Sequence, residues 1–329
     1  MTRLTLEQGK NLCCHACRLA AVGVFFLLIA LTPLSAQPIK VVVPIPPGSS
    51  LDVMTRVLAE QIGRANGPAM IVENHPGADT IIGTELVAHA APNGKTLLAA
   101  GPGVVLNPLL RKTNYDPLRS LAPVCHLAIM PTVIAVSSKS PYYTLADLLN
   151  AARIRPAQLT LASIGPASTA HLAFEQLKRA AKVDMTFVPY PGTAPAFEAT
   201  VGGHVTAAWG DVSLVAPQVR AGALRALAAA APTRLALLPD VPTLAELGFP
   251  EIGGELWFGI FAPANTLPEA TDRLATLYAD ALQANDAQKK ITNLGLYPRA
   301  FCGQDFAEFL RKQFEQYASI IRDAGIGRD

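Results

Sequence analysis

The sequence predicts an α/β fold built as two lobes, and three observations carry that prediction. Short β-branched runs alternate with longer amphipathic segments, and loops of Gly, Pro, Ser or Thr join them, which is typical of parallel strands with crossover helices. The alternation occurs as two series, separated by an apolar stretch without helical period at 121–137. The length of 329 residues also suits about two domains at ~150 residues each.

The first series opens with a buried strand, KVVVP, at 40–44. From Leu51 onward apolar residues recur at helical spacing, which predicts a helix. We then expect a strand at 70–72, a helix at 82–90 that ends at a Pro-Asn-Gly turn, and a strand at 96–100.

The second series repeats this order beyond residue 145. We expect helices and strands there at 145–152 (helix), 159–162 (strand), 169–181 (helix), and 186–188, 205–209 and 224–228 (strands).

The stretch 121–137 is interpreted as a hinge crossing between the lobes. After Pro239 we expect a short helix at 243–247, a strand at 256–261 and helices at 269–285 and 306–324, which pack back on the first lobe. The chain contains no internal repeat and no low-complexity linker, so it crosses between lobes more than once. The predicted organisation is therefore a signal peptide at 1–36, lobe 1 from 37–128 and 230–329, and lobe 2 from 129–229, with a cleft between the lobes.

Residues 1–36 are predicted to be a cleavable secretory signal. The apolar run 19–36 follows a weakly basic stretch, and small residues, Ser35 and Ala36, precede Gln37. The alternative is an uncleaved membrane anchor, because the run is near the ~18-residue threshold for a spanning helix. The whole chain carries a net charge of only +2 without clustering, which excludes a surface built for nucleic acid.

The cysteines divide between the signal and the mature chain. Cys13, Cys14 and Cys17 lie in the signal, so their spacing indicates neither a zinc site nor a redox motif. Cys125 and Cys302 remain. In an oxidising compartment they form either one disulfide or two buried free thiols, and spacing alone does not decide between these alternatives.

Two loops are candidates for binding an anion, because ligands of open α/β sheets bind beyond the carboxyl ends of strands. The loop 46–50 offers backbone N–H groups at the start of a helix, and the loop 163–169 does the same in the second series. For Ser168 and Thr169 the alternative is ordinary helix capping, and for Asp52 it is a structural cap. His171, two residues into the second helix, is either a ligand contact or a structural histidine.

Motifs of catalysis and metal binding are absent from the sequence. It contains no GxSxG, GxxxxGK[ST], GxGxxG after a strand or HExxH, and its histidines are scattered. We therefore expect no metal and no cofactor.

The mature chain resembles the Bug or TctC-type extracytoplasmic solute receptors over almost its whole length. The signatures are VVVPIPPGSSLD (41–52), VENHPGADTIIG (72–83), APNGKTLL (91–98), NYDPLRSLAPV (114–124), VPYPGTAPA (188–196), AGALRALA (221–228), LPDVPTLAELG (238–248) and WFGIFAPANTLP (257–268). The resemblance implies a type II-like periplasmic binding protein, a two-lobed Venus flytrap with central mixed sheets flanked by helices and a hinge between the lobes.

The resemblance further implies a periplasmic receptor that does no chemistry. It would deliver a small carboxylated solute, either an organic acid or an amino acid, to membrane subunits of a tripartite tricarboxylate-type transporter, and we expect a monomer. The ligand contacts expected on these grounds are Gly48, Ser49, Ser50, Asp79, Thr80, Gly165, Ser168, Thr169, His171, Tyr190, Thr193 and Asp211.

Several positions depart from the usual family pattern, and they concern the ligand. Ser49 and Ser50 replace glycines, and Asp79-Thr80-Ile81 replaces Gly-Gly-Asn. If Asp79 faces the ligand it repels a second carboxylate and favours an amine; the alternative is a helix cap that points elsewhere. The family's Asp after an aromatic is Gly210 here, with Asp211 one place later.

Two other functions stay open from the sequence. One is a receptor that passes its signal to a sensor protein. The other is a secreted hydrolase or isomerase in which Ser168 and His171 act on the substrate, although no third group to orient His171 is evident.

Overall fold

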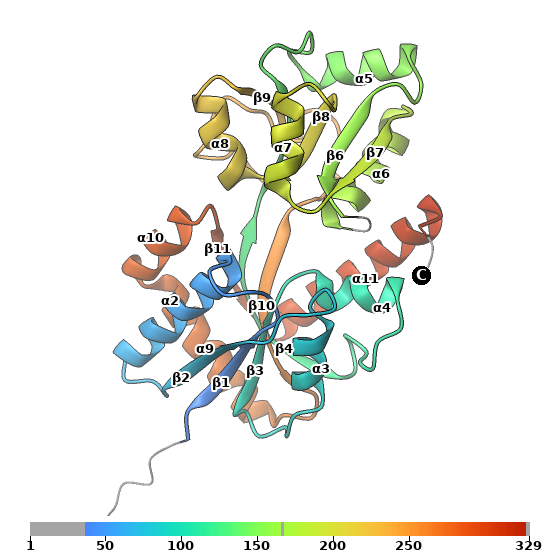
Figure 1. Cartoon of the computed structure of the whole chain (residues 1–329). Coiled ribbons are helices and arrows are strands. Elements are labelled where there is room, and N and C mark those ends of the chain that lie inside the picture. Colours follow the sequence, from blue (N-terminus) through green and yellow to red (C-terminus); the bar gives the residue numbers. More distant parts are fainter. Residues whose placement is uncertain (1–36, 166–167, 327–329) are drawn as a thin grey trace, which may run out of the picture. The chain divides into compact units, whose positions relative to one another are not determined.

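The computed structural model describes residues 37–165 and 168–326, whose strands and helices belong to one compact unit, Pro38–Asp329 (Figure 1). The predicted signal at 1–36 lies outside the described residues. In the part that is described, no helix has the length and apolar character required to span a bilayer. The strands form two mixed sheets flanked by helices, which confirms the predicted fold class.

The first sheet has the strand order β11-β4-β10-β3-β1-β2. Its strands β1, β2 and β3 are parallel, whereas β10 is antiparallel to β3 and β4, and β11 is antiparallel to β4. Its strands are β1 (Ile39–Val43), β2 (Met70–Asn74), β3 (Thr96–Ala100), β4 (Leu121–Met130), β10 (Leu256–Pro263) and β11 (Tyr297–Cys302).

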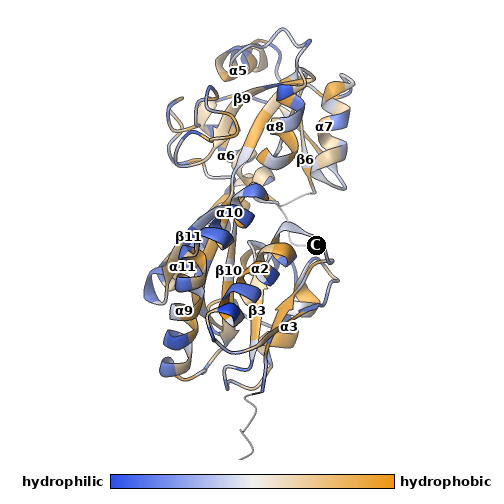
Figure 2. Cartoon of the chain, turned by 90° about the vertical axis from the view of Figure 1, so that its left-hand side faces the viewer, coloured by the Kyte–Doolittle hydropathy of each residue, from blue (hydrophilic) through white to orange (hydrophobic). Residues whose placement is uncertain are grey.

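Helices cover both faces of the first sheet because its strands alternate apolar side chains between two cores. Val41 and Val43 enter the core shared with α2, α9 and α10, and Val42 enters the core shared with α3, α4 and α11. Hydrophilic residues gather on helices such as α10, as Figure 2 shows. These helices are α2 (Ser50–Arg64), α3 (Ile81–Ala88), α4 (Gly103–Leu110), α9 (Pro268–Gln283), α10 (Asn285–Asn293) and α11 (Gln304–Ala324).

The second sheet has the order β7-β6-β8-β5-β9. Strands β7, β6 and β8 are parallel, and β5 is antiparallel to β8 and β9. Helices α5 and α6 pack on one face, and α7 and α8 pack on the other. The elements are β5 (Thr132–Ser137), α5 (Leu145–Ile154), β6 (Thr160–Ile164), α6 (Thr169–Ala181), β7 (Thr186–Tyr190), α7 (Thr193–Val201), β8 (Ala207–Asp211), α8 (Val212–Arg220) and β9 (Leu224–Ala230).

The stretch 121–137 forms two strands that belong to different sheets. Strand β4 pairs with β10 in the first sheet and β5 pairs with β8 in the second, so the chain passes from one sheet to the other at Pro131. It returns between β9 and β10.

The structure corrects the expected elements at several places. The short helix expected at 243–247 is a turn: Thr243 and Glu246 exchange hydrogen bonds as in a capping box, but Gly248, with φ +90°, ends the segment before a helix forms. Helices α4, α7, α8 and α10 and strand β11 were not expected. Pro108 and Pro217 lie inside α4 and α8, which hides both helices from a sequence pattern.

The two cysteines of the described residues form a disulfide. Cys125 of β4 and Cys302 of β11 are cross-strand partners in the first sheet, 177 residues apart in sequence. Of the two alternatives that the sequence left open, the disulfide is the one observed.

Candidate ligand-binding site

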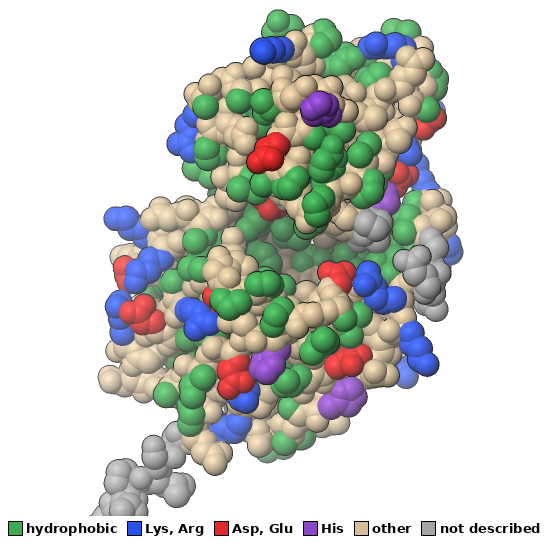
Figure 3. Space-filling model, viewed as in Figure 1, with side chains coloured by type: hydrophobic (Ala, Val, Ile, Leu, Met, Phe, Trp, Pro, Cys, Tyr) green, Lys and Arg blue, Asp and Glu red, His purple; other side chains and the backbone are tan. Residues whose placement is uncertain are grey.

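The parallel strands of both sheets end toward the place where the chain passes between the sheets. In the first sheet Leu256, which begins β10, pairs with Met130, which ends β4, at the edge where β3 ends. In the second sheet Thr132, which begins β5, pairs with Asp211, which ends β8. The loops after the parallel strands of both sheets therefore flank one region, and the surface is recessed there (Figure 3).

The loop between β1 and α2 is held together by its own side chains. Ser49 is the N-cap of α2, and its Oγ accepts a hydrogen bond from the Asp52 N–H at 3.3 Å. The Gly48 N–H donates to Asp52 Oδ2 at 2.9 Å. Of the groups predicted in this loop, the Gly48 N–H and the Ser49 hydroxyl thus have partners inside it, and the Ser50 side chain is half-buried.

Asp52 lies in the first turn of α2, and its carboxylate accepts hydrogen bonds from the groups around this loop. The residue is only 3% exposed. Arg56 lies 3.0 Å from Oδ1, and Asn74 donates to the same oxygen at 2.9 Å. Burial by itself would raise the pKa of the Asp52 carboxyl, but the hydrogen bonds from Arg56, Gly48 and Asn74 hold it below its ordinary value. Asp52 therefore has the structural role that the sequence offered as one alternative.

The loop between β2 and α3 contains three successive residues in the left-handed region. Ala78, Asp79 and Thr80 have φ of 45°, 52° and 75°, a conformation that costs L-residues about 1–2 kcal/mol each. Asn107 of α4 holds the loop: its Nδ2 donates to the Asp79 carbonyl at 2.6 Å and to Thr80 Oγ1 at 3.3 Å. Asn107 is buried and was missed from the sequence, where a lone amide inside the apolar run GVVLNPLL was the available signal.

The Asp79 carboxylate lies on the exposed side of this loop. It is 67% exposed and its Oδ2 lies 3.4 Å from a nitrogen of Arg111. The N-cap position of α3 is occupied by Thr80, and no side-chain capping bond is made there. Asp79 is therefore ion-paired, and it does not have the capping role that the sequence offered as an alternative.

In the loop that precedes α6, Ser168 acts as a helix cap. Ser168 is the N-cap, and its Oγ accepts from the His171 backbone N–H at 3.2 Å. Thr169 is buried in the first turn, and the Gly165 N–H donates to the Tyr190 carbonyl at 3.0 Å. This last bond ties the ends of β6 and β7 together.

The His171 ring is packed against the second sheet. It stacks on Phe187 of β7 with ring centroids 3.9 Å apart, and its Nε2 lies 3.9 Å from Glu175 Oε1. Burial, the main cause, lowers the pKa of His171, and Glu175 partly offsets that effect. A stacked ring in this position has the surroundings of a structural histidine.

Thr193 and Asp211, separated by 18 residues, are brought together at the ends of β7 and β8. Thr193 Oγ1 donates to Asp211 Oδ2 at 3.3 Å. The Thr193 side chain packs directly against the backbone of Gly210, where a Cβ would lie only 2.3 Å from Thr193 Cγ2. Burial raises the pKa of the Asp211 carboxyl above its ordinary value, and the Thr193 hydrogen bond lowers it in part.

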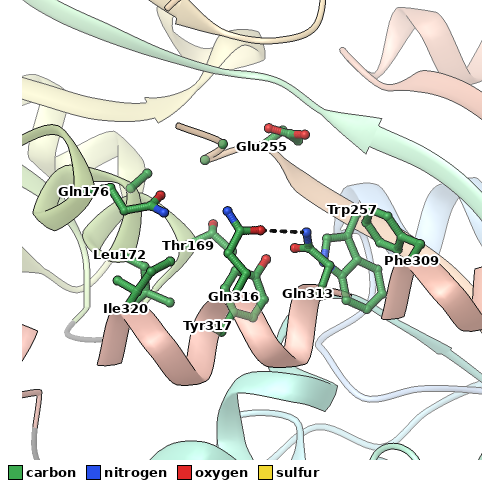
Figure 4. A pocket seen from close by; sticks show the side chains of 13 residues that line it. Thr169, Leu172, Gln176, Glu255, Trp257, Phe309, Gln313, Gln316, Tyr317 and Ile320 are labelled. Atoms are coloured by element: carbon green, nitrogen blue, oxygen red, sulfur yellow. Dashed lines mark hydrogen bonds between the residues drawn. The ribbon is translucent and has the colours of Figure 1, made fainter. Parts of the chain in front are cut away.

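A small pocket lies beside these loops, between α6 and α11 (Figure 4). Gln313 donates to Gln316 at 3.3 Å, and the buried Trp257 Nε1 has no hydrogen-bond partner among the described residues. The cavity measures about 40 Å³, which suits a few water molecules, whereas organic ligands occupy sites of roughly 300–1,000 Å³. Within residues 37–165 and 168–326 no three metal-ligating side chains gather into one group.

Comparison with known proteins gives consistent matches along the chain. The family model described as the tripartite tricarboxylate transporter family receptor matches residues 54–326. The protein BugT of Bordetella pertussis is 33% identical over 318 residues, which are 93% of this chain and 97% of BugT.

Two solved structures with bound acids share this fold. One, an R. palustris protein with adipate, is 28% identical, has a TM-score of 0.74 and covers 89% of this chain and 98% of its own. The other is MatC from Rhodopseudomonas palustris with bound malate. It is 28% identical, has a TM-score of 0.68 and covers 87% of this chain and 99% of the MatC chain.

Proposed function

Because the chain belongs to the tripartite tricarboxylate transporter receptor family, we propose that it binds one small organic carboxylate between its two sheets and delivers it unchanged to a tripartite-type membrane transporter. The observation that carries the proposal is the convergence of strand-to-helix junctions from both sheets on one recessed region. Binding there favours a closed arrangement of the two lobes over an open one.

Backbone N–H groups and hydroxyls at these junctions suit a carboxylate, because a helix N-terminus attracts negative charge. The relatives that carry adipate and malate support the same ligand class. The proposed contacts are those predicted from the sequence, with Ser50, Thr80, Ser168 and Thr169 as the hydroxyl donors. His171 has the weakest support, because it stacks on Phe187.

Proteins of this family are periplasmic. We propose that residues 1–36 direct this chain to the same compartment as a cleavable signal, and that the mature protein is a monomer. The disulfide between Cys125 and Cys302 suits an oxidising compartment.

A hydrolytic function that uses Ser168 and His171 has less support. The Ser168 hydroxyl accepts the His171 backbone N–H as a helix cap, and the His171 ring stacks on Phe187. A serine nucleophile also needs its hydroxyl to donate to a neighbouring base, and a helix cap of this kind forms without one.

Thermal unfolding with and without candidate ligands tests the proposal. The protein is unfolded and refolded to remove carried-over ligand and then heated with mono-, di- and tricarboxylates. A true ligand at ~100 times its Kd stabilises the folded state by about 2.7 kcal/mol and is recovered chemically intact. No stabilisation by any carboxylate, or conversion of the ligand into a product, contradicts the proposal.

A further inference from the structure

Asp211 is a residue of the candidate site whose carboxylate makes few contacts within the protein. It occupies the N-cap position of α8, yet its side chain makes no capping hydrogen bond. The one hydrogen bond to its carboxylate from the described residues is the 3.3 Å contact from Thr193, and none of those residues forms an ion pair with it. Since a carboxylate has about four acceptor positions, most of its acceptor capacity remains available.

Asp211 lies at the edge of the second sheet where the candidate site is formed. Asp211 ends β8 at the same edge as the ends of β6 and β7, beside the loops that enter α6 and α7. The residue is half-buried, so the carboxylate is both partly desolvated and reachable.

A carboxylate in this place acts on ligand choice in two ways. It repels any carboxylate of the solute that approaches it, and it stabilises a cation there more strongly than a fully hydrated carboxylate would. Burial without a counter-charge is unfavourable, and a bound cationic group relieves it.

The other acidic candidate does not have these properties. Asp79 is 67% exposed and is paired with Arg111 at 3.4 Å, so its charge is screened by water and largely compensated. Of the two acidic residues expected at the site, Asp211 is therefore the one that can distinguish cationic from neutral solutes.

We infer that Asp211 is a specificity-determining residue that accepts the protonated amine of the solute, so that this receptor takes an amino acid-type zwitterion in preference to the corresponding plain carboxylic acid. This inference rests on the proposed function, because the carboxylate of the same solute binds at the helix N-termini nearby.

The test compares matched pairs that differ only in the amine. Isothermal titration measures the Kd of the ligand-free protein for succinate against aspartate, glutarate against glutamate, adipate against 2-aminoadipate, and valerate against 5-aminovalerate. Malate is included because its hydroxyl is a neutral donor. We expect at least one amino member to bind tenfold or more tightly than its desamino partner.

Asp211→Asn is the informative variant, because it keeps the shape of the side chain and removes its charge. We expect it to weaken binding of the preferred amino acid by 10- to 100-fold and to leave the desamino partner unchanged or improved. Asp184→Asn is the matched control, since it removes an exposed negative charge before β7, at the opposite edge of the same sheet. Its affinities should equal those of the wild type.

The outcomes separate this inference from the function on which it rests. Tighter binding of desamino acids or of malate, or an amine preference that persists in Asp211→Asn, overturns the role of Asp211 and leaves the receptor function standing. Absence of binding for every acid in the panel overturns the inference, whereas the proposed function falls only if the wider thermal-unfolding panel of mono-, di- and tricarboxylates also gives no stabilisation.

Discussion

The two sheets treat the carboxylates at their strand ends in opposite ways. In the first sheet Asp52 is 3% exposed and has Gly48, Arg56 and Asn74 as partners. In the second sheet Asp211 is half-buried and has one partner, Thr193. A carboxylate whose acceptor positions are filled by protein donors stabilises the fold, whereas one with free acceptor positions is available to a ligand.

Two further groups of the first sheet belong to its interior. The first sheet also contains the disulfide and the buried His126, which is surrounded by aromatic rings. We therefore expect changes at these first-sheet positions to act mainly on the free energy of unfolding, and changes at the strand ends of the second sheet to act mainly on binding.

The largest effect is expected from removing the disulfide. Replacing Cys125 and Cys302 together by alanine frees a loop of 177 residues in the unfolded chain, which corresponds to a loss of about 5 kcal/mol. Guanidinium unfolding of the variant measures this loss, and reduction of the wild-type protein should give a similar one. Equal stability with and without the cross-link would contradict the stabilising role given to the first sheet.

Asp52→Ala should be the next largest perturbation. It removes the acceptor shared by the Gly48 N–H, the Arg56 guanidinium and the Asn74 amide at a position that is 3% exposed, so we expect a loss of about 3 kcal/mol. Urea unfolding measures it, with the exposed Glu251→Ala as a control that should stay within about 0.5 kcal/mol of the wild type. A loss below about 1 kcal/mol for Asp52→Ala would show that the loop does not depend on this carboxylate.

His126 should make the first sheet sensitive to acid. Burial, with a smaller effect of Arg299, lowers the pKa of His126 from 6.5 to about 3. The unfolded chain therefore binds a proton at His126 more tightly than the folded chain does. The contribution of neutral His126 to the free energy of unfolding is complete above pH 6.5 and is lost as the pH falls toward 3. Between pH 6.5 and 4.5 the loss is about 2–3 kcal/mol at 1.36 kcal/mol per pH unit.

The variant His126→Phe fits an apolar ring into the same aromatic cluster and should remove that part of the pH dependence. Chemical unfolding at pH 4.5, 5.5, 6.5 and 7.5 measures it. The slope that remains includes His171, whose pKa is also lowered by burial. An unchanged slope in His126→Phe would mean that His126 does not titrate as its burial predicts.

The sequence predicted the regular parts of this fold because hydrophobic period and loop composition are local signals. Helix α6 lies where it was expected, at Thr169–Ala181, and β3 lies at Thr96–Ala100. The pattern failed where tertiary packing overrides propensity, as in α4 and α8, which form in spite of Pro108 and Pro217. It also failed at Glu246, whose capping-box partner Thr243 starts only a turn.

At the candidate site the sequence predicted which loops and which residue types take part. It did not predict the contacts between residues that are distant in sequence. That Ser168 is an N-cap follows from its place before an apolar helical pattern. That Asn107 holds the Asp79–Thr80 loop, or that Thr193 meets Asp211, depends on how separate segments pack. One sequence contains no signal for such pairs.

The smallest effect on stability is expected from Asp211→Asn. Because burial raises the pKa of Asp211, its charged form destabilises the folded state, and this cost is fully present above the folded pKa and disappears as the pH falls below the unfolded value. At pH 7 the asparagine should therefore leave the free energy of unfolding within about 1 kcal/mol of the wild type or increase it slightly.

Urea unfolding of ligand-free Asp211→Asn beside Asp52→Ala sharpens the comparison between the two sheets. If Asp211→Asn lost as much stability as Asp52→Ala, the second-sheet carboxylate would be a structural group like its counterpart. If Asp211→Asn hardly changes the free energy of unfolding but strongly changes which ligand is bound, the carboxylate at the end of β8 acts in binding, whereas Asp52 acts in folding.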